Sequence, residues 1–258
     1  KQEYARYSWD ADLMAKWSRS EILLTVYDNS GEHRFHMPTI SDYWHSKDRT
    51  LGLNTRYTRE IFQRNGMKNV LTAGYEYQNQ WAEPQPGWIA WARANMPAKF
   101  MNFGDYGRNN HDVYVFNEFT KGGFINTLGI REHWNDRSEK WETLPEAGFL
   151  YALNDRTAAR AKISKGFRQP RFSELYLFPA HNEHLEPEAV WSYEAALTHS
   201  LTSWLTTAVN PFYMDVKNLI QTVPNSSPPP ASINRNSGKF VIKGIETEIE
   251  ARPLRSIA

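Results

Sequence analysis

The sequence contains no cysteine among its 258 residues, which excludes a disulfide framework and a thiolate-bound metal site. Its formal net charge is only +1 and no basic stripe runs along it, which argues against a nucleic-acid-binding protein. No run approaches the roughly 18 consecutive apolar residues of a membrane helix. No basic and apolar signal peptide opens the chain, so we expect Lys1 to be an internal start of an exported protein.

Aromatic residues, by contrast, are abundant, with 10 Trp, 13 Tyr and 13 Phe. Apolar and polar residues alternate with a period of two in 71–81, 157–167 and 245–251, which is typical of strands with one apolar and one wet face. On the polar side of 245–251, three carboxylates follow one another: Glu246, Glu248 and Glu250. Such a row requires water, which the lumen of a barrel supplies.

This pattern predicts eleven strands, near 4–14, 18–28, 50–61, 69–81, 112–121, 124–134, 143–151, 157–167, 188–199, 204–216 and 240–251. Most are about as long as the roughly 9–11 residues that cross a bilayer at a tilt. Strands of globular proteins are typically shorter, about 5–6 residues. The lengths therefore favour a membrane barrel over a soluble sandwich.

The connections between these strands alternate between tight and mostly long. The tight ones are 15–17, 63–68, 122–123, 152–156 and 200–203, and the longer ones are 29–49, 82–111, 135–142, 168–188 and 221–239. Short turns at one end and long loops at the other are typical of an outer-membrane barrel. Two features oppose a regular strand pattern: Pro211 removes a ladder bond from 204–216, and 112–120 is apolar on both faces. We expect the lumen side of 112–120 to pack against another part of the protein.

Five motifs occur in a fixed order over about a third of the chain. They are KGFRQPRFSELY (165–176), LEPE (185–188), SYEAAL (192–197), NPFYMDVKNLIQ (210–221) and INRNSGKFVIKGIETEIE (233–250). Together they resemble the C-terminal half of TonB-dependent outer-membrane receptors of the siderophore-receptor type. Before Pro145 the resemblance is weaker.

The resemblance implies an all-β fold, an antiparallel transmembrane β-barrel. Residues 1–258 would be a fragment of the barrel domain, about half of a roughly 22-stranded barrel, without the plug domain and its TonB-contacting box. In such a receptor the plug would be the part that packs against the lumen side of 112–120. Further strands must close the sheet, because bare edges are not viable in lipid. The implied function is TonB-energised uptake of a ferric siderophore across the bacterial outer membrane, with TonB, the substrate and membrane lipid as partners.

No catalytic constellation stands out in the sequence. It contains no Gly-x-Ser-x-Gly elbow, no His-Glu-x-x-His pair and no glycine-rich phosphate loop. A solvated lumen wall explains the paired carboxylates at Glu246 and Glu248. We therefore predict that the protein is not an enzyme and needs no cofactor, the substrate itself being an iron chelate.

The long loops are the expected ligand site. Candidate residues that would stack on or charge-pair with an anionic chelate are Trp88, Trp91, Arg93, Tyr106, Arg168, Arg171 and Tyr176. For the loop aromatics the alternative is an interface girdle. For Arg168, Arg171, Glu174 and Tyr176 it is a rim ion pair, with Tyr176 marking the bilayer boundary.

Histidine and methionine in the loops support a second substrate class. Soft or borderline ligands for copper or another metal ion would be His181, His184, Met96, Met101 and His111. His181 and Glu183 stand where the resembling family has Gly-Asn-Pro, so a solvated loop is the alternative there. Outside this family, a soluble β-rich carbohydrate-binding protein with tryptophans stacked on sugars remains open, and the sequence does not identify the substrate.

Overall fold

The computed structural model describes residues 2–35, 44–84, 106–176, 180–226 and 232–252. Eleven strands and one short helix make up the described residues. The strands are β1 (Gln2–Trp17), β2 (Ser20–Phe35), β3 (Trp44–Arg64), β4 (Met67–Pro84), β5 (Tyr106–Lys121), β6 (Phe124–Asn135), β7 (Trp141–Asn154), β8 (Thr157–Arg168), β9 (Glu188–Ser200), β10 (Leu205–Pro224) and β11 (Ser232–Ala251), and the helix is α2 (Phe172–Leu175). Each predicted strand lies within or overlaps one of these, so the eleven-strand prediction is confirmed.

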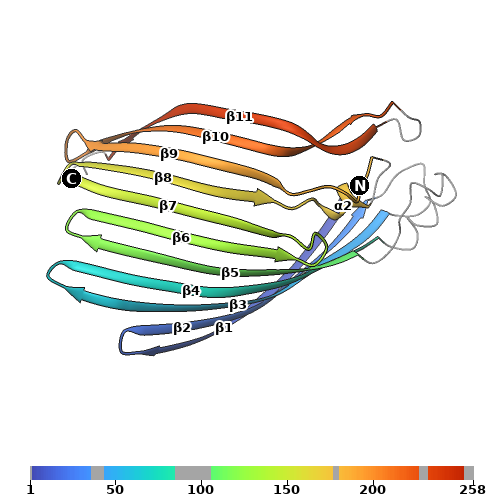
Figure 1. The fold of residues 1–258 in the computed structure, drawn as a ribbon, viewed down its shortest axis with the longest axis horizontal. Helices are drawn as coiled ribbons and strands as arrows, with labels where there is room; N and C mark the ends of the chain where they lie inside the picture. Colours follow the sequence, from blue (N-terminus) through green and yellow to red (C-terminus); the bar gives the residue numbers. More distant parts are fainter. Residues whose placement is uncertain (1, 36–43, 85–105, 177–179, 227–231, 253–258) are drawn as a thin grey trace, which may run out of the picture.

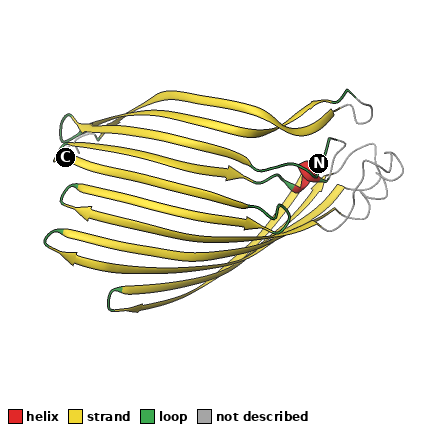
Figure 2. Ribbon diagram, viewed as in Figure 1, coloured by secondary structure: helices red, strands yellow, loops and turns green. Residues whose placement is uncertain are grey.

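The strands form one curved antiparallel sheet in chain order, from β1 to β11 (Figure 1). Tight turns join the strands at one end, and α2 and the strand ends that flank the longer connections lie at the other, as Figure 2 shows. In the described residues β1 and β11 pair on one side only, so the sheet is not closed. Within that part of the chain no helix is long and apolar enough to span a membrane.

The register gives the sheet one polar and one apolar face. Glu76 lies opposite Asp112, and Arg131 opposite Tyr114, on the polar face. Large exposed side chains cover the apolar face, including Leu13, Val115, Ile130, Leu197, Ile245 and Ile249. No second layer of described residues covers these side chains, which is expected for a transmembrane barrel whose outer face meets lipid.

Aromatic residues gather on the apolar face at two levels. Near the long loops, His111 packs against Tyr77 and Trp134 at ring-centroid distances of 5.1 and 5.3 Å, and its Nδ1 lies 2.7 Å from the Tyr75 hydroxyl. We call these four residues the loop-side girdle. Beyond it, Asn79 donates to Asn109 at 2.9 Å, so the outward face is polar there.

The second level lies near the tight turns. It contains the pairs Trp17–Tyr57 and Phe124–Tyr151, with ring centroids 6.2 and 6.4 Å apart. Strand β6 alone runs from Phe124 at this level to Trp134 at the loop-side girdle. That stretch is about the length that crosses a bilayer, roughly 9–11 residues.

Pro211 does interrupt a ladder, as its lack of an N–H requires. It pairs with Ile245 of β11, but the pairing of β10 with β9 passes from Val209 directly to Phe212. Strand β10 nevertheless continues through Pro211, from Leu205 to Pro224.

The aromatic residues on the polar face of β5 pack within the sheet. Tyr114 lies opposite Gly74 and Phe116 opposite Gly129. A Cβ added to Gly74 would lie 2.3 Å from the Tyr114 ring, so the ring lies flat on the glycine backbone. This packing explains why 112–120 is apolar on both faces, and the expected contact with a plug stays a prediction.

Candidate functional site

The segment after β8 turns onto the polar face at the loop end of the sheet. Gln169 and Pro170 end the strand, because proline cannot continue the ladder. The single helical turn α2 follows, and the Glu174 carboxylate accepts a hydrogen bond from the Arg171 backbone N–H at 2.7 Å. This local cap fixes the start of the helix.

Arg168 joins this segment to three strands. Its guanidinium donates two hydrogen bonds of 2.7 Å to the Glu188 carboxylate and two of 3.0 and 3.2 Å to Glu174. Glu188 also accepts the backbone N–H of Ile220 in β10 at 2.9 Å. The hub formed by Arg168, Glu174 and Glu188 therefore connects β8, α2, β9 and β10, in the manner of the predicted rim ion pair.

A small core lies beside this hub. It contains Tyr106, Leu175, Tyr176 and Leu185, with Phe172 and Ile220 packed against it. Tyr106 and Tyr176 are only 5% and 3% exposed. Their rings, predicted to stack on a ligand, stack on each other.

Buried polar residues of β5 and β6 hold the segment on its other side. The Gln169 amide donates to Asn110 at 3.1 Å and contacts the His133 ring, and His133 lies 3.1 Å from Asp112. Asn135 donates to Asn110 at 2.6 Å. These residues were not among the predicted site residues, although the sequence carries a signal for them: polar side chains occupy successive polar-face positions at the loop ends of two neighbouring strands.

A pocket of about 290 Å³ lies where these parts meet, and we call it the loop-end pocket. Its lining includes Arg108, Arg137, Gln169, Tyr176, Glu183 and His184. The Arg108 guanidinium lies 4.9 Å from the Phe172 ring centroid, and that of Arg137 lies 4.6 Å from the Tyr176 centroid. Such cation–π contacts orient both guanidinium groups.

Neither arginine forms an ion pair with another described residue. Arg108 donates instead to the Gln80 side chain at 2.6 Å and to the Pro170 carbonyl at 2.8 Å. It lies beyond the loop-side girdle, and burial together with Arg137 lowers the pKa of Arg108 to about 10. The group thus stays charged at neutral pH. Nearby Asp136 is hydrogen-bonded to Asn109 and also attracts the Arg108 charge, and Glu183 lines the same pocket. The two guanidinium groups form no direct ion pair with a described carboxylate, so they can bind an anionic ligand through charge-assisted hydrogen bonds.

The other predicted ligand residues lie in different places. Trp88, Trp91, Arg93, Met96 and Met101 fall in 85–105, outside the described residues. Arg171 is exposed at the start of α2, where its guanidinium makes no hydrogen bond or ion pair with another described residue.

The predicted metal ligands are not all brought together. His184 lines the loop-end pocket and His181 precedes it by three residues, whereas His111 points to the apolar face in the loop-side girdle. Within the described ranges, no group of three His, Asp or Glu residues could hold a metal ion. Metal ligation by Met96 and Met101, which lie outside the described residues, stays a prediction.

A family model described as "TonB dependent receptor-like, beta-barrel" matches residues 2–257. A curated relative, the vitamin B12 transporter BtuB of Photobacterium profundum, is 25% identical over 167 residues, which is 62% of this chain and 26% of BtuB.

Solved structures share the fold at low identity. The ferric enterobactin receptor PfeA of Pseudomonas aeruginosa, as a Q482A mutant with enterobactin, matches with a TM-score of 0.79 and 16% identity over 95% of this chain and 41% of that one. The FrpB iron transporter of Neisseria meningitidis matches with a TM-score of 0.77 and 14% identity over 98% of this chain and 42% of that one. The chain spans less than half the length of these relatives. It belongs to the TonB dependent receptor-like β-barrel family.

Proposed function

We propose that this chain is part of an outer-membrane receptor that takes up a ferric siderophore with energy delivered through TonB. Family membership supports the transporter class and the outer-membrane location, and it disfavours the soluble carbohydrate-binding alternative. The siderophore receptors among the similar structures support the substrate class, although at 14–16% identity they share only the fold.

The observation that carries the substrate proposal is the cation pair of the loop-end pocket. Arg108 and Arg137 face one cavity, and no described carboxylate pairs with either of them. An iron chelate with oxyanion donors carries negative charge, which two guanidinium groups bind through charge-assisted hydrogen bonds. A neutral or cationic substrate would gain less from the two guanidinium groups than an anionic one.

The size of the pocket limits what it holds. Its volume of about 290 Å³ is at the lower end of small-molecule sites, which occupy roughly 300–1,000 Å³. The pocket therefore takes one arm of the chelate, and the remainder would meet the long loops, including Trp88, Trp91 and Arg93. Tyr106 and Tyr176 support the pocket wall by their mutual stacking.

Transport in this proposal needs no covalent chemistry. The Arg168 hub and the small core hold the wall of the pocket in place, so that binding energy is not used to order it. TonB would act on a plug to admit the bound chelate. A corrinoid is the second candidate substrate, because the curated relative is a vitamin B12 transporter.

The test uses the full-length protein purified in detergent and tryptophan fluorescence. The ligands are ferric enterobactin, cyanocobalamin and cupric ions, each titrated separately. We expect saturable quenching by the ferric chelate. In the double variant Arg108→Gln/Arg137→Gln the affinity for the ferric chelate should be about 10- to 100-fold lower, because charge-assisted hydrogen bonds are lost.

Arg156→Gln provides the matched control, because Arg156 lies in the tight turn between β7 and β8 at the opposite end of the sheet. The Arg156→Gln variant should bind the ferric chelate with the affinity of the wild type. Equal affinities for the double variant and this control would refute the role of the cation pair. If only cyanocobalamin or only copper bound saturably, the substrate would be a corrinoid or a metal ion and not a ferric siderophore.

A further inference from the structure

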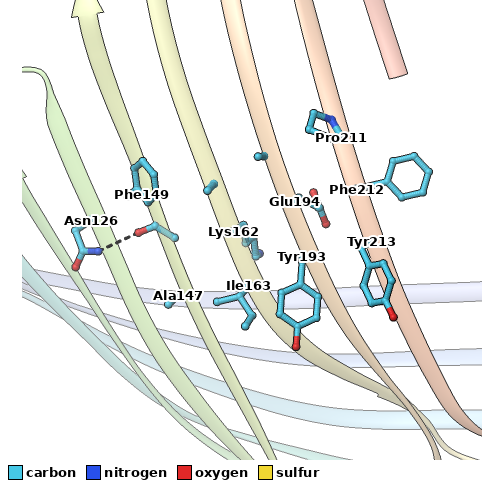
Figure 3. Close-up of a pocket in the computed structure, with 13 residues that line it drawn as sticks. Asn126, Ala147, Phe149, Lys162, Ile163, Tyr193, Glu194, Pro211, Phe212 and Tyr213 are labelled. Carbon is cyan, nitrogen blue, oxygen red and sulfur yellow. Dashed lines mark hydrogen bonds between the residues drawn. The ribbon is translucent and has the colours of Figure 1, made fainter. Parts of the chain in front are cut away.

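The apolar face is hollowed across β6 to β10, and Figure 3 shows the side chains that line this hollow. The loop-end pocket, by contrast, lies on the polar face. The volume of this apolar-face groove is about 540 Å³. Its lining on that face consists of Asn126, Ala147, Phe149, Ala161, Ile163, Tyr193, Ala195, Pro211 and Tyr213. With one exception these side chains are apolar or aromatic.

The register explains why the face is hollow at this point. Ala161 of β8 and Ala195 of β9 are direct cross-strand partners, so two methyl groups form the floor. Phe149 lies opposite Ala161 on the other side and forms one wall. The ladder between β9 and β10 passes over Pro211, which leaves this part of the sheet without a regular row of side chains.

The polar atoms of the groove are satisfied or lie on the other face. The Asn126 amide, the exception in the lining, donates to the Gly148 carbonyl at 3.1 Å (Figure 3). Lys162 also borders the groove, but its ammonium pairs with Glu146 at 2.9 Å. The groove therefore suits a hydrocarbon chain and offers little to a polar ligand.

One end of the groove is different. Figure 3 shows the hydroxyls of Tyr193 and Tyr213 pointing in the same direction, away from Phe149 and Pro211. That direction leads to the loop end of the sheet, because β10 runs from Pro211 through Tyr213 towards Pro224. The two rings contact each other at a centroid distance of 6.0 Å.

A cationic residue lies on the strand next to Tyr213. Lys243 of β11 is the register partner of Tyr213 on the same face, and it forms no ion pair with any described residue. The neighbouring carboxylate on this face, Asp215, lies 3.9 Å from the Lys217 ammonium. Tyrosine hydroxyls and a lysine at the loop-side end of an apolar groove match the chemistry of a lipid with a phosphate headgroup.

We propose that the apolar-face groove binds an anionic lipid of the leaflet on the loop side. The acyl chain lies over Ala161 and Ala195, and the phosphate accepts hydrogen bonds from Tyr193, Tyr213 and Lys243. The proposal rests on the membrane location given under the proposed function, but it does not depend on the transported substrate. A bilayer supplies acyl chains to this face, whereas a second copy of the chain would bury the Lys243 cation, which has no ion-pair partner among the described residues.

Native mass spectrometry of the delipidated full-length protein in detergent tests the proposal. The probes are dimyristoyl phosphatidylglycerol and dimyristoyl phosphatidylcholine, which share acyl chains and differ in headgroup charge. We expect the wild type to retain the anionic lipid about fivefold better, the effect of one lysine near the headgroups. Lys243→Gln should abolish this preference without loss of the zwitterionic lipid.

Filling the groove should act on both lipids. Ala161→Leu should lower the retention of each about tenfold, because it occupies the space of the acyl chain. Ala73→Leu is the control, since Ala73 lies on the apolar face of β4, away from the groove, and should bind as the wild type. Equal retention of both lipids by the wild type would overturn the proposal. So would identical behaviour of the two leucine variants, or a dimer that Ala161→Leu dissociates.

Discussion

The rings of Tyr106 and Tyr176 lie almost parallel, with 5° between their planes and 4.4 Å between their centroids. One begins β5 and the other follows α2, so the pair holds the segment after β8 against a strand from a distant part of the sequence. Because both rings are buried, their role is to position the loop-end pocket.

Replacing Tyr176 should therefore release α2. Tyr176→Ala removes one ring of the stack and part of a small core, a local loss of about 2–4 kcal/mol. We expect trypsin to cleave after the exposed Arg171 at least about tenfold faster, because cleavage follows the population of the opened segment. Tyr151→Ala, which removes an exposed ring from the apolar face, should leave the rate unchanged. Equal rates in the two variants would show that the stack does not hold the helix.

Arg168 should stabilise the hydrogen bond that the backbone N–H of Ile220, in β10, donates to Glu188. The Ile220 N–H donates to Glu188, and Glu188 is held by Arg168. Arg168→Gln should speed hydrogen exchange of the Ile220 amide about 5- to 30-fold, which corresponds to about 1–2 kcal/mol for a partly exposed, charge-assisted contact. Arg160→Gln, near the tight-turn end of the same strand, is the control. Unchanged exchange at Ile220 in the Arg168 variant would contradict the hub.

Gly74 should tolerate no side chain. A Cβ at this position would lie 2.3 Å from the Tyr114 ring and 2.4 Å from the Thr55 carbonyl oxygen, and the backbone atom cannot move aside. We expect Gly74→Ala to lower the free energy of unfolding by about 1–3 kcal/mol. Urea unfolding in detergent, followed by tryptophan fluorescence, measures this change.

Gly107→Ala is the matched control for that experiment. The nearest atom to a Cβ at Gly107 is the Gln80 carbonyl oxygen at 3.6 Å, an ordinary contact. The substitution should change the free energy of unfolding by less than about 0.5 kcal/mol. If both alanine variants unfold at the same urea concentration, the Tyr114 ring does not pack against the backbone of Gly74.

Lys140 should titrate above its ordinary range. Its ammonium lies 2.7 Å from the Glu186 carboxylate, and this hydrogen bond raises the pKa of Lys140, which lies in the connection between β6 and β7. Since the folded state holds the proton more tightly, the contact contributes stability below the unfolded lysine pKa, about 10.4, and loses it as pH rises through the raised value. The pH profile of acetylation at Lys140 measures this shift.

Two controls accompany that titration. Glu186→Gln should return the profile of Lys140 to that of an ordinary lysine, and 1 M salt should narrow the difference, because both side chains are exposed. An unchanged profile in the Glu186 variant would mean that the two charges do not meet in solution.

The strands and their two faces were predictable from the sequence because they depend on local chemistry. A period of two places every second side chain on the same face wherever the backbone is extended, so Ala161 and Ile163 could be assigned to the apolar face without a structure. Pro211 likewise predicts a missing ladder hydrogen bond, because proline has no backbone N–H. The family motifs around Arg168 could be recognised for the same reason, since they lie in one stretch of chain.

The pockets depended on the tertiary structure. Arg108 and Arg137 face one cavity only because β5 pairs with β6 in one register and the chain after Pro170 folds back over both strands. The placement of His111 on the apolar face, away from His184, follows from the same register. A one-residue shift would reverse it.

The sequence by itself thus determined the strand order, the wet and apolar faces and the family. Which side chains meet was decided by the register and by the path of the loops, because those contacts join residues from distant parts of the sequence. The local periodicity of the sequence does not specify contacts between residues that are far apart in the chain. The packed sheet specifies them through its register and loops.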